Sequence, residues 1–212
     1  MLTPLVLVLA ACGAGWGFVS DRIGARWPAH DDASVRPMDW RTGVTVATGA
    51  IALGGLTLRF TDPLEAVVFG AYLAALVLLM ATDLDQRLLP DAITLPMIPL
   101  ALVFDLAGRN PLVPPGVLPI AIAVAIVLPL LLYAFSLPFG AGAFGQGDVK
   151  LLFSVGLMAG PLRLFTGVVY GALFAGLVLV VLLALRRITL KSYVPFGPFL
   201  IFGAIWALLA GG

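Results

Sequence analysis

The stretch 81-ATDLDQRLLPDAITLP-96 follows a long apolar run and contains three carboxylates, Asp83, Asp85 and Asp91. A charged side chain at the centre of a membrane helix costs about 2.5–3.5 kcal/mol on insertion scales. We therefore expect these acids to gather at one membrane boundary unless a polar cavity receives them. A second polar group, 145-GQGDVK-150, opens another apolar segment. Its acid, Asp148, can meet the first group at the same face of a bilayer.

The composition is that of an integral membrane protein. Hydrophobic residues make up 61% of the chain and charged residues 11%, against roughly 45–50% and 25% in soluble domains. At roughly 20 apolar residues per span, residues 1–212 hold seven or eight helices in a single transmembrane domain within the lipid bilayer. The net charge of +1 comes with no basic patch, so no nucleic-acid partner is expected. The single cysteine, Cys12, excludes an intrachain disulfide and a cysteine-built zinc site, and no metal is expected.

Hydropathy divides the chain into eight helices, which predicts an all-α, polytopic membrane fold. The predicted spans are residues 2–19, 43–60, 63–81, 91–107, 115–137, 148–159, 164–185 and 194–209. Asp91, directly after Pro90, is the expected N-cap of the fourth span. Pro96 and Pro99 interrupt that span and free backbone carbonyls, so it is a candidate for a kinked wall around a wet site.

Basic residues predict the orientation of the chain. The polar segment 21–42 is expected to be a short, solvated cytosolic loop, in which His30 is an ordinary solvated side chain. With this loop inside, nine of the twelve basic residues lie on the cytosolic side, and Arg59, Arg109 and Arg163 lie outside. This distribution follows the positive-inside rule. Both acidic motifs then face the cytosol.

Asp148 and one upstream acid form a candidate catalytic pair. Two carboxylates that share a site repel each other, so one of them is expected to hold a proton. The ionised partner can take a proton from water as the water attacks a carbonyl, while the protonated partner supports the developing oxyanion. Asp83 is favoured over Asp85 because it lies closest to the apolar span. For Asp148, an N-cap role fits the spacing as well as catalysis does.

Other residues of the two motifs are expected to support this pair. Gly145 and Gly147 allow unusual dihedral angles and the close approach of a substrate backbone. Lys150 is expected to pair with a carboxylate or to extend to the membrane interface. Asp85 points away from Asp83 and is expected to hydrogen-bond near Arg87 or to tune the catalytic pair.

Four segments, in chain order, resemble motifs of the type IV prepilin peptidases. The segment 83-DLDQRLLPD-91, with Leu95 and Pro96 after it, resembles their first active-site motif, and 145-GQGDVK-150 resembles their GxGD motif. The segment 194-VPFGPF-199 is similar to their last-helix signature, and 15-GWGFVSDRIGARWP-28 to the region after their first span. The resemblance covers nearly the whole chain. It implies that Asp83, seven residues before Pro90, and Asp148 are the catalytic acids.

The resemblance also implies a function. Members of this family are aspartyl endopeptidases of the bacterial inner membrane that remove the short basic leader from type IV pilin-like precursors. They cut on the cytosolic side, after a glycine, and the proteolysis needs no cofactor. Many also methylate the new N-terminus with S-adenosylmethionine and carry a larger cytosolic insert with two zinc-binding CxxC pairs. Here the corresponding region, 29–42, is short and lacks cysteine, which counts against methyl transfer.

Two functions of other classes fit the same sequence. A small transporter also uses proline-broken helices and membrane acids, although the acids here cluster at one boundary and the two halves do not repeat. A catalytically inactive assembly factor would keep the fold and both acids. A serine–lysine pair built on Lys150 or Lys191 is a less favoured catalytic alternative.

Overall fold

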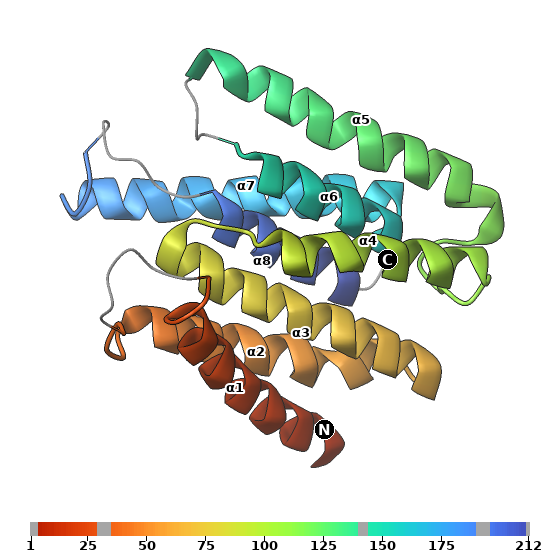
Figure 1. The fold of residues 1–212 in the computed structure, drawn as a ribbon, viewed down its shortest axis with the longest axis horizontal. Coiled ribbons are helices and arrows are strands. Elements are labelled where there is room, and N and C mark those ends of the chain that lie inside the picture. The colour runs from red at the N-terminus through yellow and green to blue at the C-terminus, as the bar shows by residue number, and fades with distance from the viewer. Residues whose placement is uncertain (1–3, 29–34, 140–143, 190–195, 211–212) are drawn as a thin grey trace.

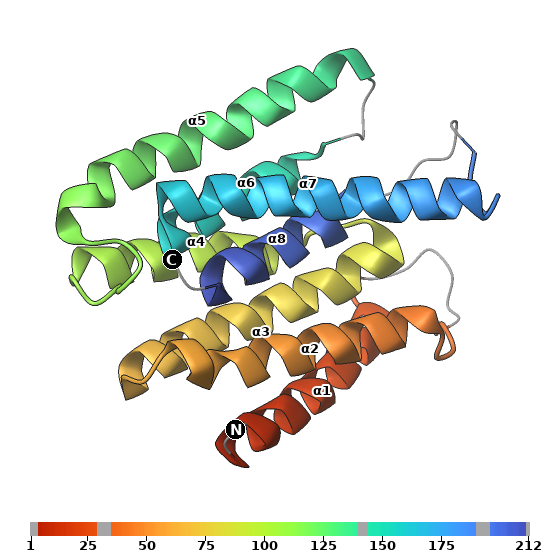
Figure 2. The ribbon, with the colours of Figure 1, turned by 180° about the vertical axis from the view of Figure 1, so that it is seen from behind.

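The computed structural model describes residues 4–28, 35–139, 144–189 and 196–210, which form eight α-helices and no strand. The all-α prediction is confirmed. Figures 1 and 2 show the helices running side by side as an elongated bundle. The helices are α1 (Pro4–Gly24), α2 (Trp40–Arg59), α3 (Pro63–Gln86), α4 (Asp91–Leu106), α5 (Leu118–Ser136), α6 (Gln146–Ala159), α7 (Pro161–Ala184) and α8 (Gly197–Leu209), with short 3-10 turns η1 (Pro115–Val117) and η2 (Leu137–Phe139) at the two ends of α5.

The helices differ in length in a way that shapes the interior. Within the described ranges, α1, α3, α5 with η1, and α7 are long and apolar enough to cross a membrane. In contrast, α4, α6 and α8 have only 16, 14 and 13 residues. At about 1.5 Å per residue α6 reaches roughly 21 Å, less than the roughly 30 Å of a bilayer core. A helix as short as α6 therefore places at least one of its polar ends inside the thickness of a bilayer core rather than at its surface.

Two helix boundaries differ from the predicted ones where the acidic motifs lie. α3 continues to Gln86 instead of ending at residue 81, so Asp83 and Asp85 belong to its last turn. α6 begins at Gln146, two residues before Asp148. The acids are thus held by regular helix rather than by connecting loops, and their relative directions are fixed by the helical repeat.

The expected solvated loop 21–42 is also corrected. α1 continues through Gly24 and α2 already begins at Trp40. Asp21, the first acid of the segment, is only 1% exposed and lies in a cluster of ion pairs. His30 lies outside the described residues.

α3 packs between two groups of helices. Figures 1 and 2 show α1 and α2 on one side of it and α4 and α8 on the other, and Phe69, Leu73 and Leu76 are fully buried along it. The hydroxyl groups of Tyr72 and Ser154 lie 2.8 Å apart, and both side chains are completely buried. This hydrogen bond ties α3, which carries Asp83, to α6, which carries Asp148.

Replacing Tyr72 by phenylalanine should destabilise the bundle, because the Ser154 hydroxyl is left buried without its partner. We expect the free energy of unfolding to fall by about 1–3 kcal/mol, measured by denaturant titration in detergent. Tyr170→Phe is the control, since Tyr170 is 46% exposed. The double variant Tyr72→Phe/Ser154→Ala should cost less than the sum of the two single changes. If the losses of unfolding free energy in the two single variants simply added up in the double variant, the hydrogen bond between Tyr72 and Ser154 would not stabilise the bundle.

Candidate active site

A cavity of about 610 Å³ lies where α3 ends and where α4 and α6 begin. Both acidic motifs line it: Asp83 and 87–92 contribute one wall, 145–148 and Lys150 the other, and Pro28 closes it from the end of α1. Asp148 is close enough for its charge to act on Asp83. The fold therefore brings the two predicted catalytic acids to one cavity.

Asp83 is enclosed by the end of α3. Its side chain is 5% exposed, and its buried Oδ2 atom has no hydrogen-bond partner among the described residues. Its carbonyl accepts the N–H of Arg87 at 2.9 Å, and Arg87 then adopts the left-handed conformation with φ 55°. This reversal ends α3 directly after the acid and sends the chain through Leu88–Pro90 into α4.

Asp148 is positioned by the first turn of α6. Gly145 is the N-cap of this helix, and its N–H donates to Asp148 Oδ2 at 2.7 Å. Asp148 is therefore not the N-cap that the spacing allowed but the third helical residue, with its carboxylate folded back over the helix start. No hydrogen bond to Oδ1 occurs within the described part of the chain, so this oxygen has no described protein partner.

Gly147 explains how the two motifs come into contact. A Cβ atom at position 147 would lie 3.0 Å from the Cβ of Leu89, which is closer than side chains normally pack. The missing side chain lets the first turn of α6 lie directly against the connection between α3 and α4. Gly147 thus acts on helix packing, in addition to any approach by a substrate.

Gly197, the first residue of α8, is a site residue that the sequence analysis did not identify. A Cβ at this position would lie 2.7 Å from Cγ and 2.9 Å from Oδ1 of Asp83. The backbone of α8 therefore rests against the Asp83 carboxyl group. The signal in the sequence was the glycine between Phe196 and Pro198, a segment that carried the family resemblance but no assigned role.

Asp85 lies on another side of α3, because two residues correspond to about 200° of helix rotation. Its Oδ1 accepts from Arg36 Nε at 2.6 Å and from Arg41 Nη1 at 3.0 Å. Arg36 also pairs with Asp21 and Asp39. We call Asp21, Arg36, Asp39, Arg41 and Asp85 the ion cluster. It binds α1, α2 and the segment between them to the end of α3, a role that was not predicted for Asp85.

Asp91 and Lys150 form an ion pair between α4 and α6 beside the cavity. The Lys150 Nζ atom lies 2.6 and 2.8 Å from the two oxygens of Asp91. The predicted N-cap role of Asp91 is wrong, since Pro90 takes that position without a side-chain bond. Lys150 has the carboxylate partner expected for it.

The alternative of a catalytic serine–lysine pair gains no support here, because the Ser154 hydroxyl, on the same helix as Lys150, is hydrogen-bonded to Tyr72. Lys191 lies outside the described residues.

No cluster of three or more histidine, cysteine, aspartate or glutamate side chains suited to a metal ion occurs in the described ranges. The polar groups at the cavity are the carboxylates of three aspartates, the side chains of Arg87, Gln146 and Lys150, and backbone groups. This arrangement can polarise a water molecule between two acids and can bind a polypeptide backbone beside them.

The bundle and its cavity with two acids belong to a known class of membrane protein. Residues 70–185 match the model of the type IV leader peptidase family. The match covers more than half of the chain, and the chain belongs to this family. The matched range includes both acids, the end of α3 and all of α4 to α6.

Particular relatives are named prepilin leader peptidase/N-methyltransferase. The protein of Burkholderia pseudomallei is 32% identical over 198 residues, covering 90% of this chain and 59% of its own length. That of Aeromonas salmonicida is 40% identical over 142 residues, or 64% of this chain and 46% of the relative. That of Pseudomonas putida is 37% identical over 161 residues, or 72% and 53%. The chain thus spans about half to three fifths of these relatives. No solved structure matches it.

Removing the Asp85 carboxylate should loosen the ion cluster, because Arg36 and Arg41 lose their shared acceptor. Asp85 is 4% exposed in this pairing, so we expect Asp85→Ala to lower the free energy of unfolding by about 1–3 kcal/mol. Glu65→Ala, at the other end of α3, is the control and should change stability by less than about 0.5 kcal/mol. Equal effects of the two changes would show that the cluster does not hold α3.

Proposed function

We propose that the chain is a membrane aspartyl endopeptidase in which Asp83 and Asp148 are the catalytic acids. The observation that carries the proposal is that both acids, each set in a family motif, line one cavity at the meeting point of α3, α4 and α6. A hydrolytic role accounts for two carboxylates that face one cavity.

The proposed reaction needs no covalent intermediate. One carboxylate is ionised and the other holds a proton, because two close carboxylates do not both carry charge easily. The ionised acid accepts a proton from water, the water oxygen attacks the peptide carbonyl, and the protonated acid donates to the developing oxyanion. Collapse of this intermediate breaks the C–N bond, and the leaving amine takes a proton from the acid pair.

The proposed substrate is a precursor of the type IV pilin class, whose short basic leader is removed after a glycine. This rests on the family and on the relatives' names. A precursor whose apolar helix lies in the bilayer would present its leader to the cavity beside the helix ends. The Asp91–Lys150 pair and the backbone of 145–148 line that cavity.

The proposed location is the bacterial inner membrane, with the cavity facing the cytosol. Arg87 and Lys150 line the cavity itself, and Arg36 and Arg41 lie beside it. Arg59 ends α2, Arg109 follows α4 and Arg163 lies in the first turn of α7. These three helix ends lie at the opposite end of the bundle (Figures 1 and 2). This asymmetry supports the orientation, since basic residues concentrate on the cytosolic side.

Methyl transfer is not part of the proposal. The relatives' names include N-methyltransferase, an activity that would use S-adenosylmethionine. In this chain, however, the region 29–42 is short and lacks cysteine. Proteolysis by the two acids requires no such cofactor.

Neutralising either acid should stop cleavage while leaving the fold intact. We expect Asp83→Asn and Asp148→Asn each to lower the rate of leader removal at least about a thousandfold, since an amide cannot accept the proton from water. The assay follows the size of a co-expressed pilin-like precursor on a gel. Asp62→Asn, at the opposite end of α3 and outside the cavity, is the matched control and should retain cleavage, because asparagine can also cap a helix.

Normal processing by both variants would overturn the proposal. A substrate-dependent flux through wild-type protein in vesicles, with no change in precursor size, would identify a transporter. A wild-type chain that inserts but cleaves no precursor from its own organism would identify a catalytically inactive member of the family.

Gly197→Ala should impair cleavage by displacing Asp83, because the new methyl group overlaps the carboxyl group. We expect kcat to fall about tenfold or more, with a smaller change in KM, since Gly197 does not itself line the cavity. Gly176→Ala on α7 is the control, because a Cβ there meets no atom within 4 Å. Unchanged kcat in Gly197→Ala would show that Asp83 does not depend on this contact.

A further inference from the structure

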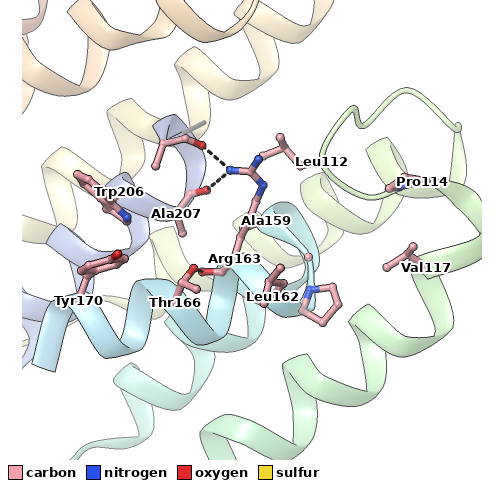
Figure 3. A pocket seen from close by; sticks show the side chains of 13 residues that line it. Leu112, Pro114, Val117, Ala159, Leu162, Arg163, Thr166, Tyr170, Trp206 and Ala207 are labelled. Atoms are coloured by element: carbon pink, nitrogen blue, oxygen red, sulfur yellow. Dashed lines mark hydrogen bonds between the residues drawn. The ribbon is translucent and has the colours of Figure 1, made fainter. Parts of the chain in front are cut away.

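We propose that a cavity at the end of the bundle opposite the acids binds the phosphate group of an anionic phospholipid through Arg163. This cavity has a volume of about 430 Å³, within the range of small-molecule sites. It lies where α6 ends, α7 begins and α8 ends, and Figure 3 shows Arg163 within it. It shares no residue with the cavity that holds Asp83 and Asp148.

The guanidinium group of Arg163 is held in place with part of its hydrogen-bonding capacity unused. Its Nη1 atom donates to the carbonyls of Ala207 and Ala210 at 3.3 and 2.5 Å, which caps the end of α8 (Figure 3). Nε and Nη2 donate to no group in the described part of the chain. These two nitrogens form the parallel pair of donors with which arginine binds phosphate oxygens.

The surroundings favour an anion. No aspartate or glutamate lines the cavity, and neither Arg163 nor Arg59 has an acidic partner within the described ranges. Arg59 is close enough for its positive charge to act on Arg163. The first turn of α7 adds to this potential, since it contains no acid and its N-cap, Gly160, has no side chain to satisfy the free N–H groups.

The rest of the lining favours a lipid over a soluble anion. Leu162 is 73% exposed on the outside of the bundle, and Leu112 and Val117 form an apolar wall. Tyr170 and Trp206 also line the cavity, with ring centroids 5.0 Å apart (Figure 3). Aromatic rings of this kind gather at the level of lipid headgroups. A phosphodiester on Arg163 would leave its acyl chains against this apolar surface.

The test uses the full chain, purified in a neutral maltoside detergent and stripped of lipid. Phosphatidylglycerol should raise the midpoint of thermal unfolding by about 5 °C near saturation, given the size of the chain. Phosphatidylcholine with the same acyl chains should raise it by less than about 1 °C. Soluble glycerol 3-phosphate at the same concentration should have no effect. The measurement needs no substrate, so it is independent of the proposed peptidase activity.

Two variants assign the effect to this cavity. Arg163→Gln should raise the phosphatidylglycerol concentration for half the shift at least tenfold, whereas Arg109→Gln, an arginine at the same end that does not line the cavity, should leave it unchanged. Val117→Trp fills the cavity and keeps Arg163, and should abolish the shift even if Arg163→Gln does not fold. An unchanged response in Val117→Trp would overturn the proposal. If phosphatidylcholine raised the unfolding midpoint as much as phosphatidylglycerol, the site would not recognise the negative charge of the headgroup. If glycerol 3-phosphate raised it as much, the ligand would be a soluble phosphate and not a lipid. Either result would overturn the proposal.

Discussion

The cost of placing carboxylates in an apolar bundle governs this structure. Asp83 belongs to a helix whose other buried side chains are almost all apolar, so its charge has to be received by something polar. The polar surroundings of the acid come from the ends of neighbouring helices rather than from side chains. α6 and α8 are too short to span a full bilayer core, and their first turns begin beside the last turn of α3. The N–H of Gly145 thereby reaches Asp148, and one cavity reaches both acids.

Missing side chains set how closely these helix ends approach. Gly147 brings α6 against Leu89, and Gly197 brings α8 against the carboxyl group of Asp83. On another side of α3, Asp85 draws in Arg36 and Arg41. The end of α3 is therefore held by packing on one side and by ion pairs on another. The position of Asp83 depends on residues from α1, α2 and α8, far from it in sequence.

Hydropathy was sufficient to predict the helices, because a span depends on the composition of a single segment. Spacing alone left Asp85 and an N-cap role for Asp148 open, and the family motifs selected Asp83 and Asp148, which line one cavity. An acid that ends one apolar helix and an acid that begins another meet if the helices run in opposite directions. Gly197 could not be predicted in the same way, since its contact exists only once α8 packs across α3. Asp105 shows the same limit. It lies near the end of an apolar helix, yet it is 3% exposed and accepts a hydrogen bond from Asn110, a contact that its own segment does not indicate.

The two cavities present different unused groups. In the cavity with the acids, Oδ2 of Asp83 and Oδ1 of Asp148 have no hydrogen-bond partner in the described part of the chain. In the cavity at the other end, the Nε and Nη2 atoms of Arg163 donate to no described group, because α8 supplies carbonyls to Nη1 instead of a carboxylate. A site with unused acceptors suits water and a peptide, and a site with unused cationic donors suits a phosphate. In the two proposals, a polypeptide and a lipid headgroup bind at opposite ends of the bundle, in cavities that share no residue, so they do not compete.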